Sequence, residues 1–263
     1  METRNVGMSM LIPLVVGSLF STVAQAQSGT VRLYAGLAPT TYQISFDQNA
    51  PNFSGGINYK NKTAKSNYTA VNLGLTWVSP KGIYVDLSGQ QSGSATHDFW
   101  TDTTSTPQNF SHDSYTLTGG YSHAFPQGIS VSGFGGFING STVLNAPSPP
   151  FGFTKDKFDS KGIFLGVGVG YPALGGQFSG SVAVAGMNGK WTDDVSYNNH
   201  ADNTVGFSLG AGYTYKFTPA WGITGDFRFQ RYNYNFAVYS ATQPAYQVSE
   251  KIASAGVKVS YQF

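Results

Sequence analysis

The last seven residues of the chain, 257–263, alternate strictly between two kinds of side chain. Apolar residues occupy every odd position, polar residues occupy every even position, and the chain stops on Phe263. Because successive side chains of a β-strand point to opposite faces, this pattern predicts a strand with one apolar and one polar face. The alternation recurs along the chain without a competing helical period, so the sequence predicts an all-β protein.

The composition indicates where such a sheet would lie. Charged residues make up only 11% of the chain, against about 25% in soluble globular proteins. Glycine, tyrosine and phenylalanine are abundant, with 33, 16 and 19 residues. These features suit a surface that meets lipid. The formal net charge of +2 gives no basic footprint for nucleic acid, so no nucleic-acid partner is expected.

Residues 1–26 have the pattern of a secretory signal peptide. Arg4 precedes an apolar stretch at 10–23, and Ala24-Gln25-Ala26 forms a small-x-small cleavage site. The mature domain is therefore expected to span 27–263. It contains no cysteine, so no disulfide is expected.

The mature sequence offers only one way of crossing a membrane. It contains no run of 18 or more apolar residues, which excludes a transmembrane helix. An exported chain that enters a membrane can then do so only as a closed β-barrel, because lipid cannot satisfy the backbone groups of an open sheet.

Prolines divide the mature sequence at a nearly fixed period. Pro80, Pro126, Pro172 and Pro219 are 46, 46 and 47 residues apart, and each lies in a short turn sequence. A fixed period of this length indicates a structural repeat. Each unit is interpreted as a strand, a long polar loop, a second strand and a short turn, because proline and glycine mark chain reversals rather than central strands.

This division predicts ten strands. They cover approximately 30–38, 68–78, 83–91, 112–125, 129–139, 162–171, 177–186, 204–217, 221–232 and 251–263, and a continuation of the first strand past Pro39 to 46 is left open. The predicted fold is an all-β, transmembrane, antiparallel up-and-down barrel with short periplasmic turns and long extracellular loops. Ten strands fit best, and eight or twelve remain possible. The sequence Phe134-Gly135-Gly136-Phe137 interrupts the alternation and predicts a bulge.

With its alternating last strand, terminal aromatic residue and signal peptide, the chain resembles the single-chain outer-membrane β-barrels of Gram-negative bacteria, both small porin-like and surface barrels. The resemblance implies a location in the cell outer membrane, with outer-membrane lipid and lipopolysaccharide as partners. It also implies that the barrel-insertion machinery reads the C-terminal strand, here at Tyr261 and Phe263.

Aromatic residues gather beside the predicted short turns. Since amphipathic rings prefer the headgroup level, they predict a periplasmic aromatic girdle. The residues are Trp77, Phe125, Tyr171, Phe217, Trp221, Tyr261 and Phe263.

Charged residues also fall on the predicted inward face of the barrel. They are Arg32, Asp86, Lys216, Asp226, Arg228 and Lys258. One interpretation is a lumen network of ion pairs that fills a narrow barrel, since buried charges need partners. The other is a charged constriction that selects solutes in a narrow pore.

The long loops, at 47–67, 92–111, 140–158, 187–203 and 232–247, form a second candidate site. Tyrosine, tryptophan, serine and asparagine on a rigid scaffold are typical of recognition surfaces. Candidate recognition residues for a host or environmental ligand are Trp100, Trp191, Tyr234 and Tyr239. Polar filler that keeps the outer face hydrated is the alternative.

Catalysis has little support. Some ten-stranded barrels, the omptins, are surface proteases, and Asp98, Asp102, Asp193, Asp194 and His200 map loosely onto their Asp and His groups, but without a recognisable motif. Four scattered histidines predict no metal site, and no phosphate-binding glycine loop predicts a cofactor. The sequence thus predicts no enzyme. It favours a non-enzymatic barrel whose loops serve adhesion, ligand binding or envelope integrity; a narrow charge-lined channel is the alternative, and an omptin-like protease a distant third.

Overall fold

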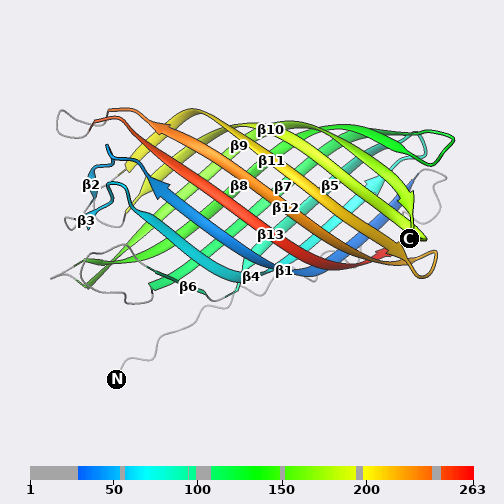
Figure 1. The fold of residues 1–263 in the computed structure, drawn as a ribbon, viewed down its shortest axis with the longest axis horizontal. Helices are drawn as coiled ribbons and strands as arrows, with labels where there is room; N and C mark the ends of the chain where they lie inside the picture. The colour runs from blue at the N-terminus through cyan, green and yellow to red at the C-terminus, as the bar shows by residue number, and fades with distance from the viewer. Residues whose placement is uncertain are drawn as a thin grey trace, which may run out of the picture.

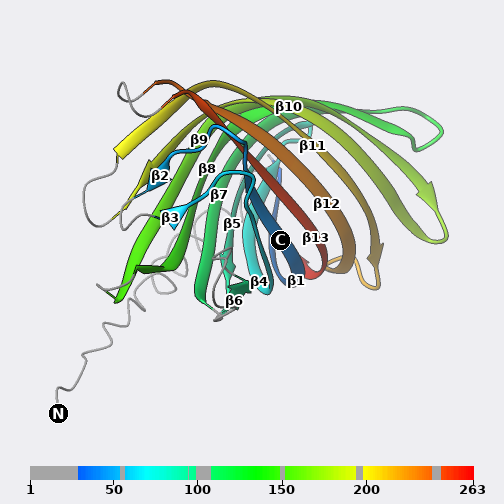
Figure 2. The same ribbon diagram turned by 60° about the vertical axis from the view of Figure 1, so that its left-hand side comes forward.

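The computed structural model describes residues 29–53, 57–93, 95–98, 108–148, 152–193, 198–238 and 244–263. In these residues ten long strands curve into one barrel (Figures 1 and 2). The strands are β1 (Thr30–Phe46), β4 (Thr63–Val78), β5 (Ile83–Ser92), β7 (Gln108–Ala124), β8 (Ser130–Ser148), β9 (Gly152–Ala173), β10 (Gly176–Thr192), β11 (Asn198–Lys216), β12 (Trp221–Phe236) and β13 (Tyr246–Gln262). The predicted signal peptide, 1–26, lies outside the described residues.

The barrel closes because β1 pairs with two partners. Leu37 lies opposite Val257 of β13 on one side and opposite Val71 of β4 on the other. All neighbouring long strands are antiparallel. The prediction of a closed ten-stranded antiparallel barrel is therefore confirmed.

Three short strands accompany the barrel at the end with the long loops. β6 (Ala95–Asp98) bridges β4 and β7, while β2 (Asn52–Phe53) and β3 (Ile57–Asn58) pair with each other. In the part of the chain that the structure describes, no helix is long and apolar enough to cross a membrane.

The opposite end of the barrel carries four short turns. In two of them the carbonyl of Ser79 or Phe125 accepts a hydrogen bond from the amide three residues on, that of Gly82 at 3.0 Å or Gly128 at 2.9 Å. The third turn is only Leu174-Gly175, and both residues have positive φ, 52° and 74°. Two-residue hairpins need this conformation to match the strand twist. The third proline was wrongly assigned to a turn, because Pro172 lies within β9 opposite Gln177.

An apolar band surrounds the half of the barrel nearest the short turns, here called the membrane half. Large apolar side chains there are solvent-exposed on the outer surface, which a soluble protein rarely allows over a continuous area. Examples are Leu37, Val71, Leu73, Val85, Leu87, Leu117, Ile163, Leu165, Val167, Val182, Val184, Leu209, Phe227 and Val257. We take this band as the lipid-facing surface.

Beyond the band the two faces of the wall exchange polarity. On β4, Val71 and Leu73 face outward in the membrane half with Asn72 inward, whereas farther along the strand Lys65 faces outward and Tyr68 inward. The region beyond the band is called the outer half. Its outer surface is polar, with exposed side chains that include Lys65, Asn67, Lys161, Asn188, Arg231 and Gln247.

The interior of the outer half is filled by apolar and aromatic side chains. We call this cluster the outer core. Its buried members are Tyr42, Ile44, Phe46, Ala50, Tyr59, Ala64, Tyr68, Ala70, Phe110, Leu144, Phe158, Ala185, Met187, Trp191, Ala201, Tyr232, Tyr234, Phe236, Tyr246, Val248 and Ile252. The outer half is thus built like a soluble β-protein, mainly apolar inside and polar outside.

The exchange of polarity explains where the predicted strands were too short. The predicted strand 177–186 continues to Thr192 as β10, and 162–171 starts at Gly152 as β9.

The predicted bulge is wrong, because β8 keeps its register past Phe134, which faces inward, and Phe137, which faces outward. Irregularities lie instead between Met187 and Gly189 and between Ala201 and Val205.

Candidate functional site in the barrel lumen

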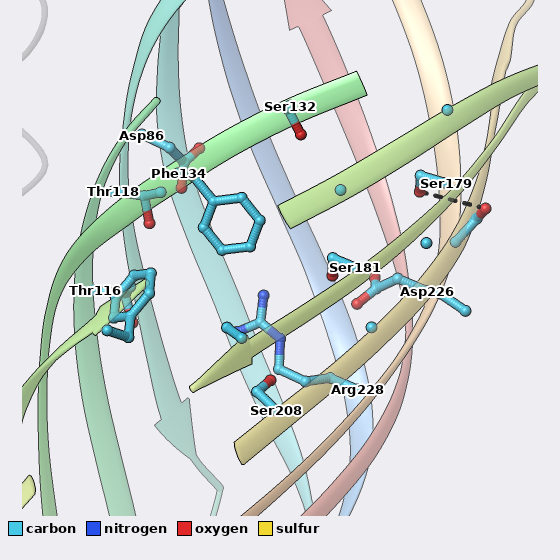
Figure 3. Close-up of a pocket in the computed structure, with 18 of the residues that line it drawn as sticks. Asp86, Thr116, Thr118, Ser132, Phe134, Ser179, Ser181, Ser208, Asp226 and Arg228 are labelled. Carbon is cyan, nitrogen blue, oxygen red and sulfur yellow. Dashed lines mark hydrogen bonds between the residues drawn. The ribbon is translucent and has the colours of Figure 1, made fainter. Parts of the chain in front are cut away.

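The membrane half encloses a cavity of about 650 Å³, called here the lumen cavity (Figure 3). Its wall is rich in short hydroxyl side chains, which leave space for water. These are Thr76, Thr116, Thr118, Ser122, Ser130, Ser132, Ser179, Ser181, Ser208 and Thr224. Toward the outer half the cavity ends against residues that pack on or in the outer core, such as Ile138, Phe164 and Tyr232.

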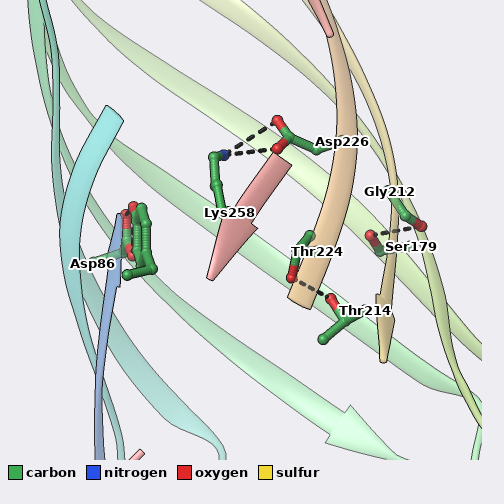
Figure 4. A network of polar contacts seen from close by, with 8 residues as sticks. Asp86, Ser179, Gly212, Thr214, Thr224, Asp226 and Lys258 are labelled. Carbon is green, nitrogen blue, oxygen red and sulfur yellow. Dashed lines mark hydrogen bonds and ion pairs between the residues drawn. The ribbon is translucent and has the colours of Figure 1, made fainter. Parts of the chain in front are cut away.

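An ion pair crosses from β13 to β12 at the cavity wall. The Lys258 ammonium lies 3.1 Å from each carboxylate oxygen of Asp226 (Figure 4). The same ammonium lies 5.7 Å from the centre of the Tyr34 ring. Both charged side chains are mostly shielded from solvent, so their mutual attraction offsets part of the cost of desolvating them.

A second acidic group lies across the lumen and is satisfied mainly by hydroxyls. Asp86 accepts hydrogen bonds from Tyr34 at 3.2 Å and from Thr76 at 2.6 Å. Arg32 joins this cluster through Thr76, whose hydroxyl oxygen lies 3.3 Å from the guanidinium nitrogen Nη2.

Arg228 differs from the other charged residues of the lumen. It is exposed to the lumen cavity, and among the described residues no carboxylate forms an ion pair with it. Figure 3 shows its guanidinium group projecting into the cavity. The structure therefore brings Arg32, Asp86, Asp226, Arg228 and Lys258 to the lumen. Lys216 lies at the rim instead, where it donates to Gln262 at 2.9 Å.

The outer core contains a buried polar network that the sequence analysis missed. Tyr234 donates a hydrogen bond to the Glu250 carboxylate at 2.9 Å. Thr142 donates to the Tyr42 hydroxyl at 3.1 Å, and the Nδ1 atom of His112 lies 2.8 Å from the Thr142 hydroxyl. The alternation of Tyr246, Val248 and Ile252 around Glu250 on one face was the signal that could have revealed a buried acid.

Burial shifts the pKa values of Glu250 and His112 in this network so that their neutral forms are favoured. Both lie above the apolar band, outside the membrane-spanning segments. Desolvation raises the pKa of Glu250 to about 7, against hydrogen bonds from Tyr42 and Tyr234 that lower it. Desolvation lowers the pKa of His112 to about 4. At neutral pH His112 is therefore uncharged, whereas the Glu250 carboxyl group titrates close to neutral pH.

Two of the predicted recognition residues do not lie on surface loops. Trp191 lies in β10 and Tyr234 in β12, and both are fully buried in the outer core, because the strands extend beyond the predicted loop borders. Trp191 packs edge-on against Phe46 at a ring distance of 5.1 Å. The other two, Trp100 and Tyr239, lie outside the described residues.

The aromatic residues of the predicted girdle lie beside the short turns and the C-terminal end of β13. Five have exposed side chains, namely Phe125, Tyr171, Phe217, Trp221 and Phe263. Tyr261 contacts two of its neighbours, with ring distances of 4.8 Å to Trp221 and 4.7 Å to Phe263. That these aromatic side chains lie at the level of the lipid headgroups remains a prediction.

Comparisons with solved structures show which known proteins share this fold. No protein-family profile and no curated protein matches the sequence. The outer membrane protease OmpT of Escherichia coli superposes with a TM-score of 0.59 at 11% identity, over 91% of this chain and 98% of that one. The translocator domain of the autotransporter NalP of Neisseria meningitidis has a TM-score of 0.49 at 10% identity, over 94% and 92%. OprG of Pseudomonas aeruginosa gives 0.42 at 12%, over 90% and 96%.

At these identities the likeness concerns the fold alone. The closed antiparallel barrel and its exposed apolar band define the class. The protein has the fold of the bacterial outer-membrane β-barrels.

Proposed function

We propose that the protein is a non-enzymatic, non-conducting outer-membrane barrel that presents its long loops for binding at the cell surface, whether for adhesion, ligand capture or envelope integrity. The main support for this proposal is the packed outer core. A packed aromatic interior makes the outer half a rigid support for loops, and it separates the lumen cavity from the cell exterior.

The connection between β1 and β4 supports the idea of firmly held loops. Ala50 and Tyr59 of this connection are fully buried. The Tyr59 hydroxyl donates to the carboxylate of Asp156 in β9. At the other side, the Asp47 carboxylate accepts a hydrogen bond from the backbone amide of Gln247 at 2.9 Å. The connection is thus fastened to strands on both sides of the barrel mouth.

The loop hypothesis is tested by changing residues outside the strands. Cells that display the barrel are assayed on a glycan array and on immobilised extracellular-matrix proteins. Replacing Trp100 and Tyr239 together by alanine is expected to reduce attachment about tenfold or more, since such aromatic anchors carry much of the energy of an interface. A matched control is Tyr115→Ala, at an exposed position in the apolar band.

Attachment that is equal in the wild type and the double variant would contradict the loop hypothesis. Excision of 99–107 or of 194–197 gives a second test. Larger deletions such as 187–203 are unsuitable, because they remove Trp191 and parts of β10 and β11 from the barrel.

A narrow channel is the second candidate, and the charged lumen cavity is the observation in its favour. Planar bilayers discriminate between the two. We expect the refolded protein to give no reproducible conductance steps, because the outer core would have to move for ions to pass. Steps that change in size with Asp226→Ala or Lys258→Ala would favour the channel and contradict the closed barrel.

We further propose the partners that the barrel class implies. The insertion machinery would read β13 with its terminal aromatic residues. Phosphate groups of lipopolysaccharide suit Lys161, which is exposed on the outer surface just beyond Ile163 of the apolar band. Cleavage of basic peptides in lipopolysaccharide-containing detergent would overturn the non-enzymatic assignment.

A further inference from the structure

A small side pocket of about 40 Å³ lies in the lumen wall next to the lumen cavity. Thr116, Arg228 and Lys258 line both spaces, so the side pocket adjoins the cavity. A single buried water needs about 10–15 Å³ of such space. The side pocket can therefore hold a small polar group, while the cavity beside it has room for the rest of a solute.

The side pocket is built by one row of neighbouring residues across five strands. Lys258 of β13 lies opposite Gly36 of β1, and Gly36 lies opposite Asn72 of β4. The row continues through Gln90 of β5 to Ser114 of β7. All these side chains share the inner face of the wall, because cross-strand partners point to the same face.

Glycine at position 36 is needed for this arrangement. A Cβ atom there would lie 2.6 Å from the Cγ atom of Lys258, which is too close. The glycine thus leaves room for the stem of Lys258 to pass along the wall toward the pocket.

The chemistry of the lining is one-sided. Among the residues that the structure describes, two cations, Arg228 and Lys258, line the side pocket, and no carboxylate does. The buried Nε2 atom of Gln90, a hydrogen-bond donor, has no partner among the described residues. Amide and hydroxyl donors from Asn72, Ser114 and others complete the lining. Two cations together with neutral groups that can donate hydrogen bonds suit an anion.

We propose that the side pocket binds the carboxylate of a small organic acid, with the remainder of the solute in the lumen cavity. The planar guanidinium fork of Arg228 suits the two oxygens of a carboxylate, and charge-assisted hydrogen bonds of this kind are the strong ones. Lys258 is already neutralised by Asp226, so Arg228 supplies the uncompensated positive charge. This inference is independent of the loop function, because the side pocket lies in the membrane half.

The experiment uses the refolded barrel in detergent and isotope-labelled acetate, whose NMR line broadens when it binds. We expect saturable broadening that is competed by unlabelled acetate more strongly than by chloride or inorganic phosphate at equal ionic strength. Arg228→Gln is expected to weaken binding about tenfold or more. Gln90→Leu, which removes the orphan donor and keeps a similar volume, is expected to weaken it several-fold.

Arg231→Gln is the matched control. It removes the same side chain from the same strand three residues farther on, where Arg231 faces outward. Acetate binding in this variant should equal that of the wild type. Heat-modifiable gel migration verifies that each variant is folded. If Arg228→Gln does not fold, the proposal is tested by the loss of acetate binding in Gln90→Leu. The proposal is overturned by unsaturable broadening in the wild type, by equal binding in Arg228→Gln, by an equal loss in Arg231→Gln, or by tighter binding of phosphate.

Discussion

Replacing Trp191 by alanine is expected to lower the free energy of unfolding by about 3–5 kcal/mol. The indole is 0% exposed and lies near the middle of the outer core, with ring distances of 5.1 Å to Phe46, 5.6 Å to Phe158 and 6.3 Å to Tyr59. Its removal would leave a cavity bounded by three rings from different parts of the chain. Urea unfolding followed by circular dichroism in phospholipid vesicles measures the loss.

Trp221→Ala provides the comparison. This tryptophan is 44% exposed at the opposite end of the barrel, where it contacts Tyr261. Since nearly half of its surface is not packed against protein, we expect a loss of only about 1 kcal/mol. Equal losses in the two variants would mean that the outer half does not contribute a packed core to stability, and would remove the support for a rigid loop platform.

The membrane half of the fold could be predicted from the sequence because lipid imposes one rule on it. Side chains such as Leu73 and Val257 face outward and polar ones face inward, so alternation marks each strand directly. The turn sequences near Pro80 and Pro126 then separated the strands correctly. These two signals were sufficient for the number of strands and their antiparallel order.

The outer half could not be predicted in the same way, because the alternation there changes phase. Along β10, Val182 and Val184 face outward, whereas Met187 and Trp191 face inward. A run whose apolar positions shift from even to odd looks like an irregular polar loop. Trp191 and Tyr234 were therefore taken for surface residues, although a second alternating segment with inverted polarity explains both.

The lumen residues show a similar division. Their inward direction followed from alternation, so Arg228 and Lys258 could be assigned to one layer. Which charges pair depends on the register between neighbouring strands and on side-chain reach, which the alternation does not contain. The pairing of Asp226 with Lys258, and the absence of a described carboxylate partner for Arg228, required the structure.

Replacing Glu250 by glutamine is expected to stabilise the barrel at pH 8 and to leave it nearly unchanged at pH 4. The carboxyl group is 1% exposed, and its pKa is raised from 4.5 to about 7 because burial disfavours the charged form. Between these two values the folded state binds more protons than the unfolded state, so the free energy of unfolding falls as the pH rises. The full penalty above pH 7 is about 3 kcal/mol.

Glutamine keeps an oxygen that can accept the hydrogen bond from Tyr234 but cannot ionise. The unfolding free energy of this variant should therefore lose the slope that the wild type shows between about pH 4.5 and 7. Asp159→Asn is the control, since Asp159 is a partly exposed carboxylate that pairs with Lys157 at 2.8 Å on the outer surface. That variant should retain the wild-type slope. If Glu250→Gln also retains it, the carboxyl group does not titrate within the folded core, and the outer core must admit water to Glu250.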